Sequence, residues 1–276
     1  MNNEYMARLS EIANEVRFKI INSIYEAQTG HAGPSLSMVE ILVFLYFKHL
    51  RIDPKHPNDP ARDRFVLSKG HGAPGLYAIL AQAGFFPPEI LSKLRKNGHP
   101  LHGHPKAEAL PGVDVSTGSL GQGLSIALGL ALGMKRRRMP NRVFCLLGDG
   151  ELQEGQNWEA MMAASGFQAD NLIAIVDRNG LQNDGPTEKI VPLEDLVAKA
   201  EAFGWKALRI NGHDFSELQR AFDETERRDG RPSFIVADTI KGKGIAYMEG
   251  VVKWHHNPIA KDEFESALME LGRNGK

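Results

Sequence analysis

The chain has 276 residues, of which 42% are hydrophobic and 24% are charged, so it can bury a substantial core. The economical interpretation is one globular domain over residues 1–276. Its net charge of -1 gives none of the strong positive field that attracts nucleic acid or an acidic membrane, so we expect neither as a partner.

Three further features bear on the location of the protein. A single cysteine, Cys145, excludes an internal disulfide and is typical of a reducing compartment, so we expect a cytoplasmic protein. The amphipathic start, residues 1–25, predicts a surface helix and not a secretory signal. The most apolar helical stretch, residues 120–134, is interrupted by glycines and is shorter than the roughly 20 residues that cross a bilayer.

Helical and strand patterns alternate along the chain. Near-continuous apolar strands separated by helices predict an α/β fold, a parallel sheet with helices on both faces. The predicted elements are, in order, helices over 1–25 and 35–50, a strand over 64–70, helices over 74–83 and 119–138, a strand over 142–150, a helix over 156–166, a strand over 172–180, a helix over 193–203, a strand over 206–212, a helix over 215–228 and a strand over 233–242.

Polar and glycine-rich segments follow several of these strands. They read "SKGHG", "GDGE", "DRNGLQND" and "KGKG". Ligands of parallel sheets bind beyond the carboxyl ends of the strands. The sequence therefore predicts a binding site at this edge of the sheet.

One pair of polar residues points to a metal ion. Asp149 and Asn179 are separated by 179 − 149 = 30 residues, about one strand-helix-strand unit, which places them at the ends of neighbouring strands. With the Leu181 carbonyl they form an oxygen-only set of the kind that holds Mg²⁺ and leaves positions for diphosphate oxygens. Gly150 would let the backbone approach that diphosphate, although Gly-Asp-Gly alone also fits an ordinary turn.

The motifs together resemble those of the transketolases. "GDGELQEG" followed by "DRNGLQNDG" is similar to their thiamine diphosphate motif. Four further segments resemble the amino-terminal portion of that family in order and approximate spacing: "TGHAGPSLSMVEIL", "RFVLSKGHGAPGLYAIL", "HGHPKAEALPGVDVSTGSLGQGLSIALG" and "WHHNP".

The resemblance implies a thiamine-diphosphate-binding fold, of which this chain is the diphosphate-binding domain. It implies that Asp149, Asn179 and the Leu181 carbonyl hold Mg²⁺ or another divalent cation such as Ca²⁺ or Mn²⁺. It also implies a set of residues near thiamine diphosphate: Lys69, His71, Gly118, Leu120, Asp149, Gly150, Asn179 and Lys241.

The resemblance also implies catalytic residues. They are His31, His71, His104, His255 and Glu154. The histidines would hold substrate hydroxyls and move protons near neutral pH. Glu154 would join a hydrogen-bonded network at a subunit interface, or more simply favour the first turn of a helix.

Two positions depart from the family pattern. Ala32 stands where many members carry proline, and "WHHNP" contains two histidines. We favour His255, directly after Trp254, over His256 as the functional one.

The implied activity is transfer of a two-carbon ketol unit from a ketose phosphate to an aldose phosphate, by default in the pentose phosphate pathway. The activating glutamate of this family lies in a pyrimidine-binding domain, and the sequence ends before such a domain begins. We therefore expect a carboxy-terminal partner chain that carries this domain, in a heterotetramer with two copies of each chain.

Several alternatives stay open. The chain could be the alpha subunit of another thiamine diphosphate enzyme such as a 2-oxo acid dehydrogenase, or a non-catalytic cofactor-binding subunit. "GQGLSI" is a weak match to the nicotinamide-binding fingerprint, because Ile126 stands at its third glycine. The histidines of "HPLHGH" could hold zinc.

Structural or exposed roles are expected for the histidines outside motifs: His49, His56 and His213.

Overall fold

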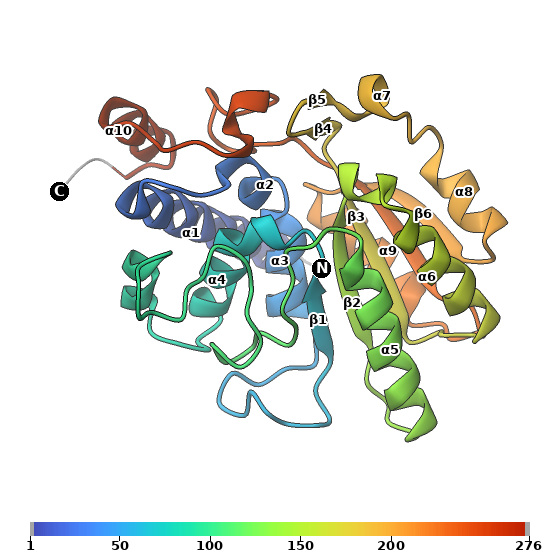
Figure 1. Cartoon of the computed structure of the whole chain (residues 1–276). Coiled ribbons are helices and arrows are strands. Elements are labelled where there is room, and N and C mark those ends of the chain that lie inside the picture. Colours follow the sequence, from blue (N-terminus) through green and yellow to red (C-terminus); the bar gives the residue numbers. More distant parts are fainter. Residues whose placement is uncertain (1–2, 274–276) are drawn as a thin grey trace.

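The computed structural model describes residues 3–273 and is built on a five-stranded parallel sheet (Figure 1). The strand order is β1-β2-β3-β7-β6, and all four neighbouring pairs run parallel. All five predicted strands are confirmed. The strands are β1 (Arg64–Leu67), β2 (Val143–Gly148), β3 (Leu172–Arg178), β6 (Lys206–Asn211) and β7 (Ser233–Asp238), with a short antiparallel pair β4 (Leu181–Gln182) and β5 (Gly185–Pro186).

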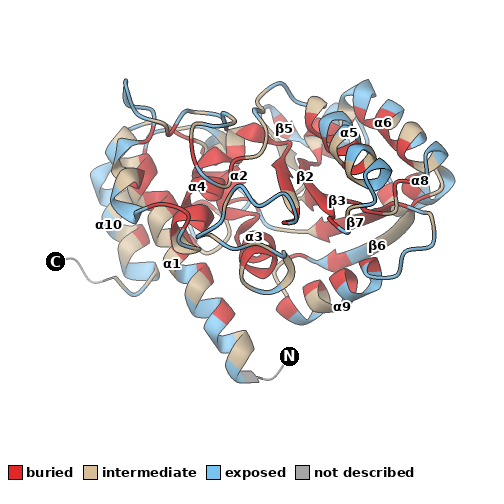
Figure 2. Ribbon diagram, turned by 90° about the horizontal axis from the view of Figure 1, so that it is seen from below, coloured by how far each residue is buried: buried red, intermediate tan, exposed pale blue. Residues whose placement is uncertain are grey.

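Helices cover both faces of this sheet, as predicted (Figure 2). One layer contains α1 to α4 and α9, and the other contains α5, α6 and α8. The helices are α1 (Asn3–Ala27), α2 (Ala32–Leu36), α3 (Val39–Phe44), α4 (Ala73–Gln82), α5 (Gln122–Arg136), α6 (Gly155–Gly166), α7 (Thr187–Ile190), α8 (Leu196–Ala202), α9 (Phe215–Thr225) and α10 (Lys261–Glu270).

Strand β2 shows why the sheet needs cover on both sides. Its alternate residues point to opposite faces. Phe144 and Leu146 belong to the core beneath α1 to α4, whereas Val143, Cys145 and Leu147 belong to the core beneath α5 and α6. All five are fully buried. The continuous apolar run therefore serves two cores.

Several predicted helices have other bounds in the structure, including α8, which begins at Leu196 after the capping Asp195. The pattern over 35–50 is broken, because Met38 leaves helical geometry (φ −102°, ψ 9°) where Ser37 donates to the buried carboxylate of Asp177. It continues as α3 and a π-helical turn over Leu45–His49. Helix α5 begins at Gln122, because Gly121 is left-handed (φ 85°), and α9 ends at Thr225.

Helix α1 was predicted as a surface helix, but one of its faces is part of the core. Leu9, Val16, Ile20 and Ile24 are buried, and α1 packs against α3 and α4. Met1 and Asn2 lie outside the described residues. At the far end of α5, residues 135–138 are exposed, as expected for a basic run. Within residues 3–273, no helix has the length and apolar character that a bilayer crossing requires.

Candidate cofactor and active site

A cavity of about 240 Å³ lies at the carboxyl ends of β1, β2 and β3. Predicted residues from widely separated segments line it together, as the sheet topology requires. They are Lys69, His71, Leu120, Asp149, Gly150, Glu154, Asn179, Leu181, Lys241 and His255. A larger hollow of about 400 Å³ beside β6 contains none of the predicted residues.

Asp149 is held at the corner of this cavity by backbone groups. Its Oδ1 accepts from the Gly150 N–H at 2.7 Å and its Oδ2 from the Gly180 N–H at 2.6 Å. Arg178 also donates to Oδ2, at 3.2 Å. Burial and the nearby Asp177 carboxylate nevertheless raise the pKa of Asp149 above its usual range. A cation bound here would oppose that shift.

The other two predicted metal ligands lie in the loop that contacts Asp149. The Leu181 N–H donates to Asn179 Oδ1 at 3.1 Å, and Lys241 Nζ donates to the Leu181 carbonyl at 2.9 Å. The set therefore offers one carboxylate, one amide oxygen and one carbonyl oxygen, a chemistry that suits Mg²⁺.

Glycines bring bare backbone to the cavity wall. A Cβ added at Gly150 would lie 2.9 Å from Gln182 Cβ, so the position has no room for a side chain. Gly118 (φ 150°) lies against Gly70, where an added Cβ would be 2.7 Å from the Gly118 nitrogen. A backbone position without a side chain beside a cavity lets the diphosphate of a cofactor approach closely. Gly118 itself does not line the cavity.

Two lysines lie beneath this wall. Lys69 is buried and pairs with the fully buried Asp177, which also accepts from Ser37. Burial alone would raise the pKa of Asp177, but Lys69 and these hydrogen bonds outweigh it and lower that pKa. Lys241 has no carboxylate in hydrogen-bond contact: within residues 3–273, Nζ contacts the Leu181 carbonyl and, at 2.8 Å, His255 Nδ1. Burial, followed by repulsion from Lys69, lowers the pKa of Lys241 to about 8.

Five histidines gather at the mouth of the cavity. We call His31, His71, His104, His255 and His256 the histidine cluster. Ring centroids lie 5.3 Å apart for His31 and His71, 5.6 Å for His31 and His255, and 5.1 Å for His71 and His255. His104 lies 6.3 Å from His31. The structure thus joins all four predicted histidines, although His31 and His104 stand outside the cavity lining.

The doubled histidine of "WHHNP" separates into two environments. His255 lines the cavity and contacts Lys241. His256 is exposed and packs 4.4 Å from His31 at the outer side of the cluster. The two histidines therefore occupy separate positions, and His255 as the functional one stays a prediction.

Burial keeps the inner histidines neutral. It is the largest cause that lowers the pKa of both His31 and His255 to about 3, with neighbouring charged groups adding to the effect. The pKa of His71 is also lowered, by burial and then by Lys69. A neutral imidazole has one donor and one acceptor nitrogen, which suits contact with sugar hydroxyls.

Glu151 is a buried site residue that sequence reasoning missed. Its carboxylate accepts from Ser68 and from the backbone N–H groups of Gly121 and Gly148, both at 3.0 Å. It thereby joins the ends of β1 and β2 to the start of α5. The fourth letter of "GDGE" was the available signal, but spacing does not reveal such long-range partners.

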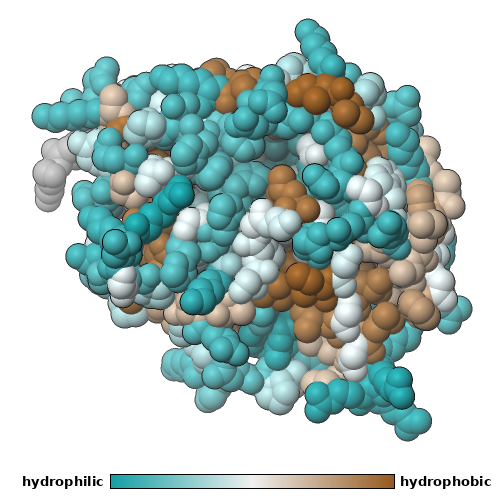
Figure 3. Space-filling view, in the orientation of Figure 1, coloured by the Kyte–Doolittle hydropathy of each residue, from teal (hydrophilic) through white to brown (hydrophobic). Residues whose placement is uncertain are grey.

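Glu154 lies at the edge of the cavity and is exposed. It precedes α6, yet its side chain makes no capping hydrogen bond. Apolar side chains are also exposed on α5 and α6 and next to their ends, and Figure 3 shows such a surface over α5. They are Leu120, Ile126, Met162 and Phe167.

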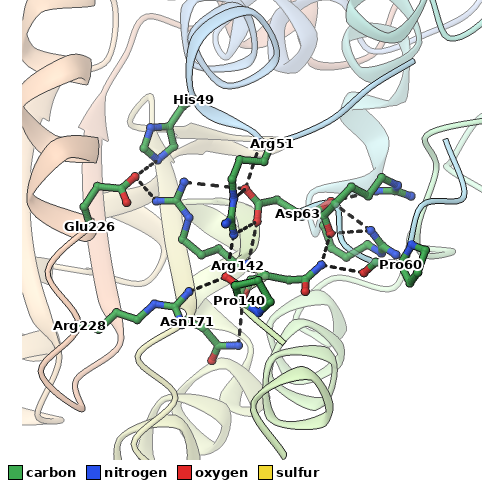
Figure 4. Close-up of polar contacts among 12 residues, drawn as sticks. His49, Arg51, Pro60, Asp63, Pro140, Arg142, Asn171, Glu226 and Arg228 are labelled. Atoms are coloured by element: carbon green, nitrogen blue, oxygen red, sulfur yellow. Dashed lines mark hydrogen bonds and ion pairs between the residues drawn. The ribbon is translucent and has the colours of Figure 1, made fainter. Parts of the chain in front are cut away.

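The remaining histidines have structural surroundings. His213 Nδ1 contacts Glu40 at 2.8 Å, and His56 is exposed beside Asp53. The side chain of His49 is 8% exposed and lies at the opposite end of the sheet, near Arg142 and Glu226 (Figure 4). Among residues 3–273, no group of three or more His, Cys, Asp or Glu is placed to hold a metal ion, so "HPLHGH" has no zinc ligand set.

The comparisons with known proteins agree with this geometry. Residues 9–276 match the family "Transketolase, thiamine diphosphate binding domain". The chain is 44% identical over 272 residues to a 6-deoxy-6-sulfo-D-fructose transketolase subunit of Clostridium sp., covering 99% of both chains. It is 40% identical to an apulose-4-phosphate transketolase subunit of Phocaeicola vulgatus, covering 92% of this chain and 90% of that one.

Solved structures give the same result. The transketolase of Campylobacter jejuni superposes with a TM-score of 0.91 at 33% identity. The match covers 99% of this chain and 43% of the Campylobacter chain, so this chain spans less than half of that transketolase.

Proposed function

The chain belongs to the transketolase family, and on that premise we propose that it is the diphosphate-binding subunit of a two-chain transketolase. The observation that carries the proposal is the match, over nearly the whole of both chains, to relatives that are named as transketolase subunits. The proposed reaction transfers a two-carbon ketol unit from a ketose to an aldose.

We propose that Asp149, Asn179 and the Leu181 carbonyl hold Mg²⁺ and that Gly150 contacts the diphosphate. Their convergence on one cavity and their oxygen-only chemistry support this assignment. Lys69, Gly118, Leu120 and Lys241 would complete the cofactor surroundings. When bound, thiamine diphosphate would supply the carbon that attacks the ketose carbonyl and carries the ketol unit.

The proposed work of the histidine cluster is to position the sugar and move protons. His31, His104 and His255 would hold substrate hydroxyls, and His71 would contact both substrate and cofactor. Their close spacing supports these roles. The lowered pKa values of His31 and His255 support the positioning role, because neutral imidazoles accept and donate hydrogen bonds without repelling one another.

A partner chain is proposed to cover the open side of the cavity. The exposed apolar residues on and next to α5 and α6, together with Glu154 at the cavity edge, support an interface there. A heterotetramer with two copies of each chain would place this surface between subunits.

The substrate class follows from the relatives. Their names place a sulfonate on carbon 6 of fructose and a phosphate on carbon 4 of apulose. We propose a ketose and an aldose that carry such anionic groups. A pentose phosphate role and a cytoplasmic location remain predictions.

The test measures ketol transfer from fructose 6-phosphate and from uncharged erythrulose to ribose 5-phosphate. It uses this chain alone, a candidate partner with a pyrimidine-binding domain alone, and the mixture. Activity only in the mixture, dependent on thiamine diphosphate and Mg²⁺, is the expected result. Turnover by this chain alone would contradict the two-chain proposal.

A further inference from the structure

A cationic side chain stands beside the histidine cluster. Arg95 is exposed, and its Nη1 lies 3.1 Å from Thr29 Oγ1 and 3.4 Å from His256 Nε2. Within residues 3–273, its side-chain hydrogen bonds go to a hydroxyl and an imidazole and to no carboxylate. The charge of Arg95 therefore has no acidic partner in direct contact, although a guanidinium readily pairs with one.

The position of Arg95 is fixed by its backbone and by a glycine. Its backbone is left-handed (φ 57°), and its N–H donates to the Leu101 carbonyl at 2.7 Å. A Cβ at Gly103 would lie 3.0 Å from Arg95 Cζ and Nε, so the guanidinium lies directly against the Gly103 backbone. The glycine of "HPLHGH", which the metal interpretation left unused, thus makes room for this arginine.

Arg95 lies one layer outside the proposed reaction centre. His71 and His255 line the cavity, His31 lies next to both, His256 packs on His31, and Arg95 contacts His256. A sugar whose carbonyl reacts inside the cavity would extend its far end along these rings toward the rim. In the relatives' substrates, that far end carries a sulfonate or a phosphate.

We propose that Arg95, with Thr29 and His256, forms a subsite for the anionic group at the end of the substrate remote from the reacting carbonyl. The inference rests on the proposed function and adds a specificity-determining residue to it. A guanidinium presents parallel N–H donors to the oxygens of a phosphate or sulfonate, and a hydroxyl and an imidazole beside it add further donors. Phosphate and sulfonate share this chemistry. The test distinguishes them with one ketose substrate that carries a phosphate and one that carries a sulfonate.

The experiment compares Arg95→Gln with wild type in the reconstituted two-chain enzyme. Arg138→Gln is the matched control, because Arg138 is also exposed and left-handed (φ 56°) but follows the far end of α5. KM is measured for fructose 6-phosphate, for 6-deoxy-6-sulfofructose and for uncharged erythrulose. Loss of one charge-assisted contact is expected to raise KM for the charged donor that the enzyme uses by about tenfold.

For Arg95→Gln, the KM for erythrulose is expected to change less than twofold, and kcat to stay near the wild-type value. Arg138→Gln should leave the KM values for all three donors unchanged. An equal change for charged and uncharged donors, or no change for either, would overturn the subsite while leaving the proposed function standing. If only one charged donor responds, the subsite is assigned to that anion.

Calorimetry measures the contribution of Arg95 to sugar binding without relying on turnover. Fructose 6-phosphate and 6-deoxy-6-sulfofructose are titrated into the assembled complex, and the affinity for at least one is expected to fall about tenfold in Arg95→Gln. Arg95→Lys keeps the positive charge but lacks the parallel N–H donors of a guanidinium, and it should recover part of that affinity. If the wild-type complex transfers no donor, the proposed function fails and the calorimetric affinities still decide the role of Arg95. Equal affinities in wild type and Arg95→Gln, or no binding of either sugar to wild type, would overturn the proposed subsite at Arg95.

Discussion

The two ends of the same sheet carry charged residues, but the charges are matched in different ways. At the amino end lies a group that we call the amino-end cluster: His49, Arg51, Asp63, Arg142 and Glu226 (Figure 4). The fully buried Asp63 accepts from Arg51 Nη2 and from the Arg142 N–H, both at 2.8 Å. Arg142 also pairs with Glu226. Each guanidinium in this cluster has a carboxylate partner.

Asp149 at the carboxyl end gives the contrast. Burial acts to raise the pKa of both Asp63 and Asp149, but for Asp63 the hydrogen bonds from Arg51 and Arg142 outweigh it and the net pKa is lowered. For Asp149, the neighbouring Asp177 adds to burial and the pKa is raised. A charge network that lowers the pKa of its buried carboxylate stabilises the scaffold, whereas a buried carboxyl beside a cavity whose pKa stays raised despite an ion pair is typical of a binding site.

The largest effect is expected from the histidine cluster. Alanine at His31, His104 or His255 should lower turnover by about 10² to 10⁴, because proton transfer and substrate positioning are lost. Cofactor affinity should stay near wild type for these three variants. Steady-state kinetics and calorimetry of the assembled enzyme check this, and near-wild-type turnover in all three would return the histidines to a structural role.

Asp63→Asn is expected to affect stability alone. Removing this carboxylate leaves Arg142, which is 6% exposed, with only the exposed Glu226 as an ion-pair partner, while the half-exposed Arg51 regains water. The free energy of unfolding should fall by about 3 kcal/mol, the lower end for breaking a buried ion pair. Urea unfolding measures this loss. Unchanged stability would mean that the amino-end cluster does not support the scaffold.

Asp149→Asn is expected to weaken cofactor binding and to leave stability nearly unchanged, the reverse of the effect of Asp63→Asn. Because the fold raises the pKa of this carboxyl, removal of its charge should cost little stability. Affinity for thiamine diphosphate with Mg²⁺ should fall tenfold or more, which corresponds to about 1.4 kcal/mol. Calorimetry on the assembled enzyme tests it, with Asp63→Asn as the matched control at a temperature where both variants are folded. Equal affinity in the two variants would erase the distinction between the two ends.

The smallest effect concerns pH. Burial is the main cause that lowers the pKa of His49 from 6.5 to about 3, so the unfolded chain takes up a proton below pH 6.5 that the native chain does not. Stability is therefore lost as pH falls, by about 1.4 kcal/mol per pH unit for this one proton. His49→Phe should reduce the slope of unfolding free energy between pH 6 and 5 by about that amount.

The same two proteins measured at higher pH provide the control. Above pH 7.5, His49 is neutral in both states, so the stability curves of wild type and His49→Phe should run parallel whatever their absolute difference. An unchanged slope between pH 6 and 5 would contradict the burial argument.

Much of the fold could be predicted from the sequence because it depends on local patterns, whereas most of the site residues were predicted from the resemblance to a family. The apolar runs of β2 and β3 predict buried strands, and the spacing of Asp149 and Asn179 predicts neighbouring strand ends. Partners distant in sequence could not be predicted. Nothing local to Glu151 indicates that it accepts from Gly121, and nothing near Arg95 indicates that it rests on Gly103.

A crystal structure of the assembled two-chain enzyme with thiamine diphosphate and Mg²⁺ would test the central claim most directly. We predict diphosphate density beside Gly150 and a cation contacting oxygens of Asp149, Asn179 and Leu181, with the amino-end cluster unchanged and free of ligand. A cofactor bound elsewhere on the chain, or a cation without contact to Asp149, would contradict the account.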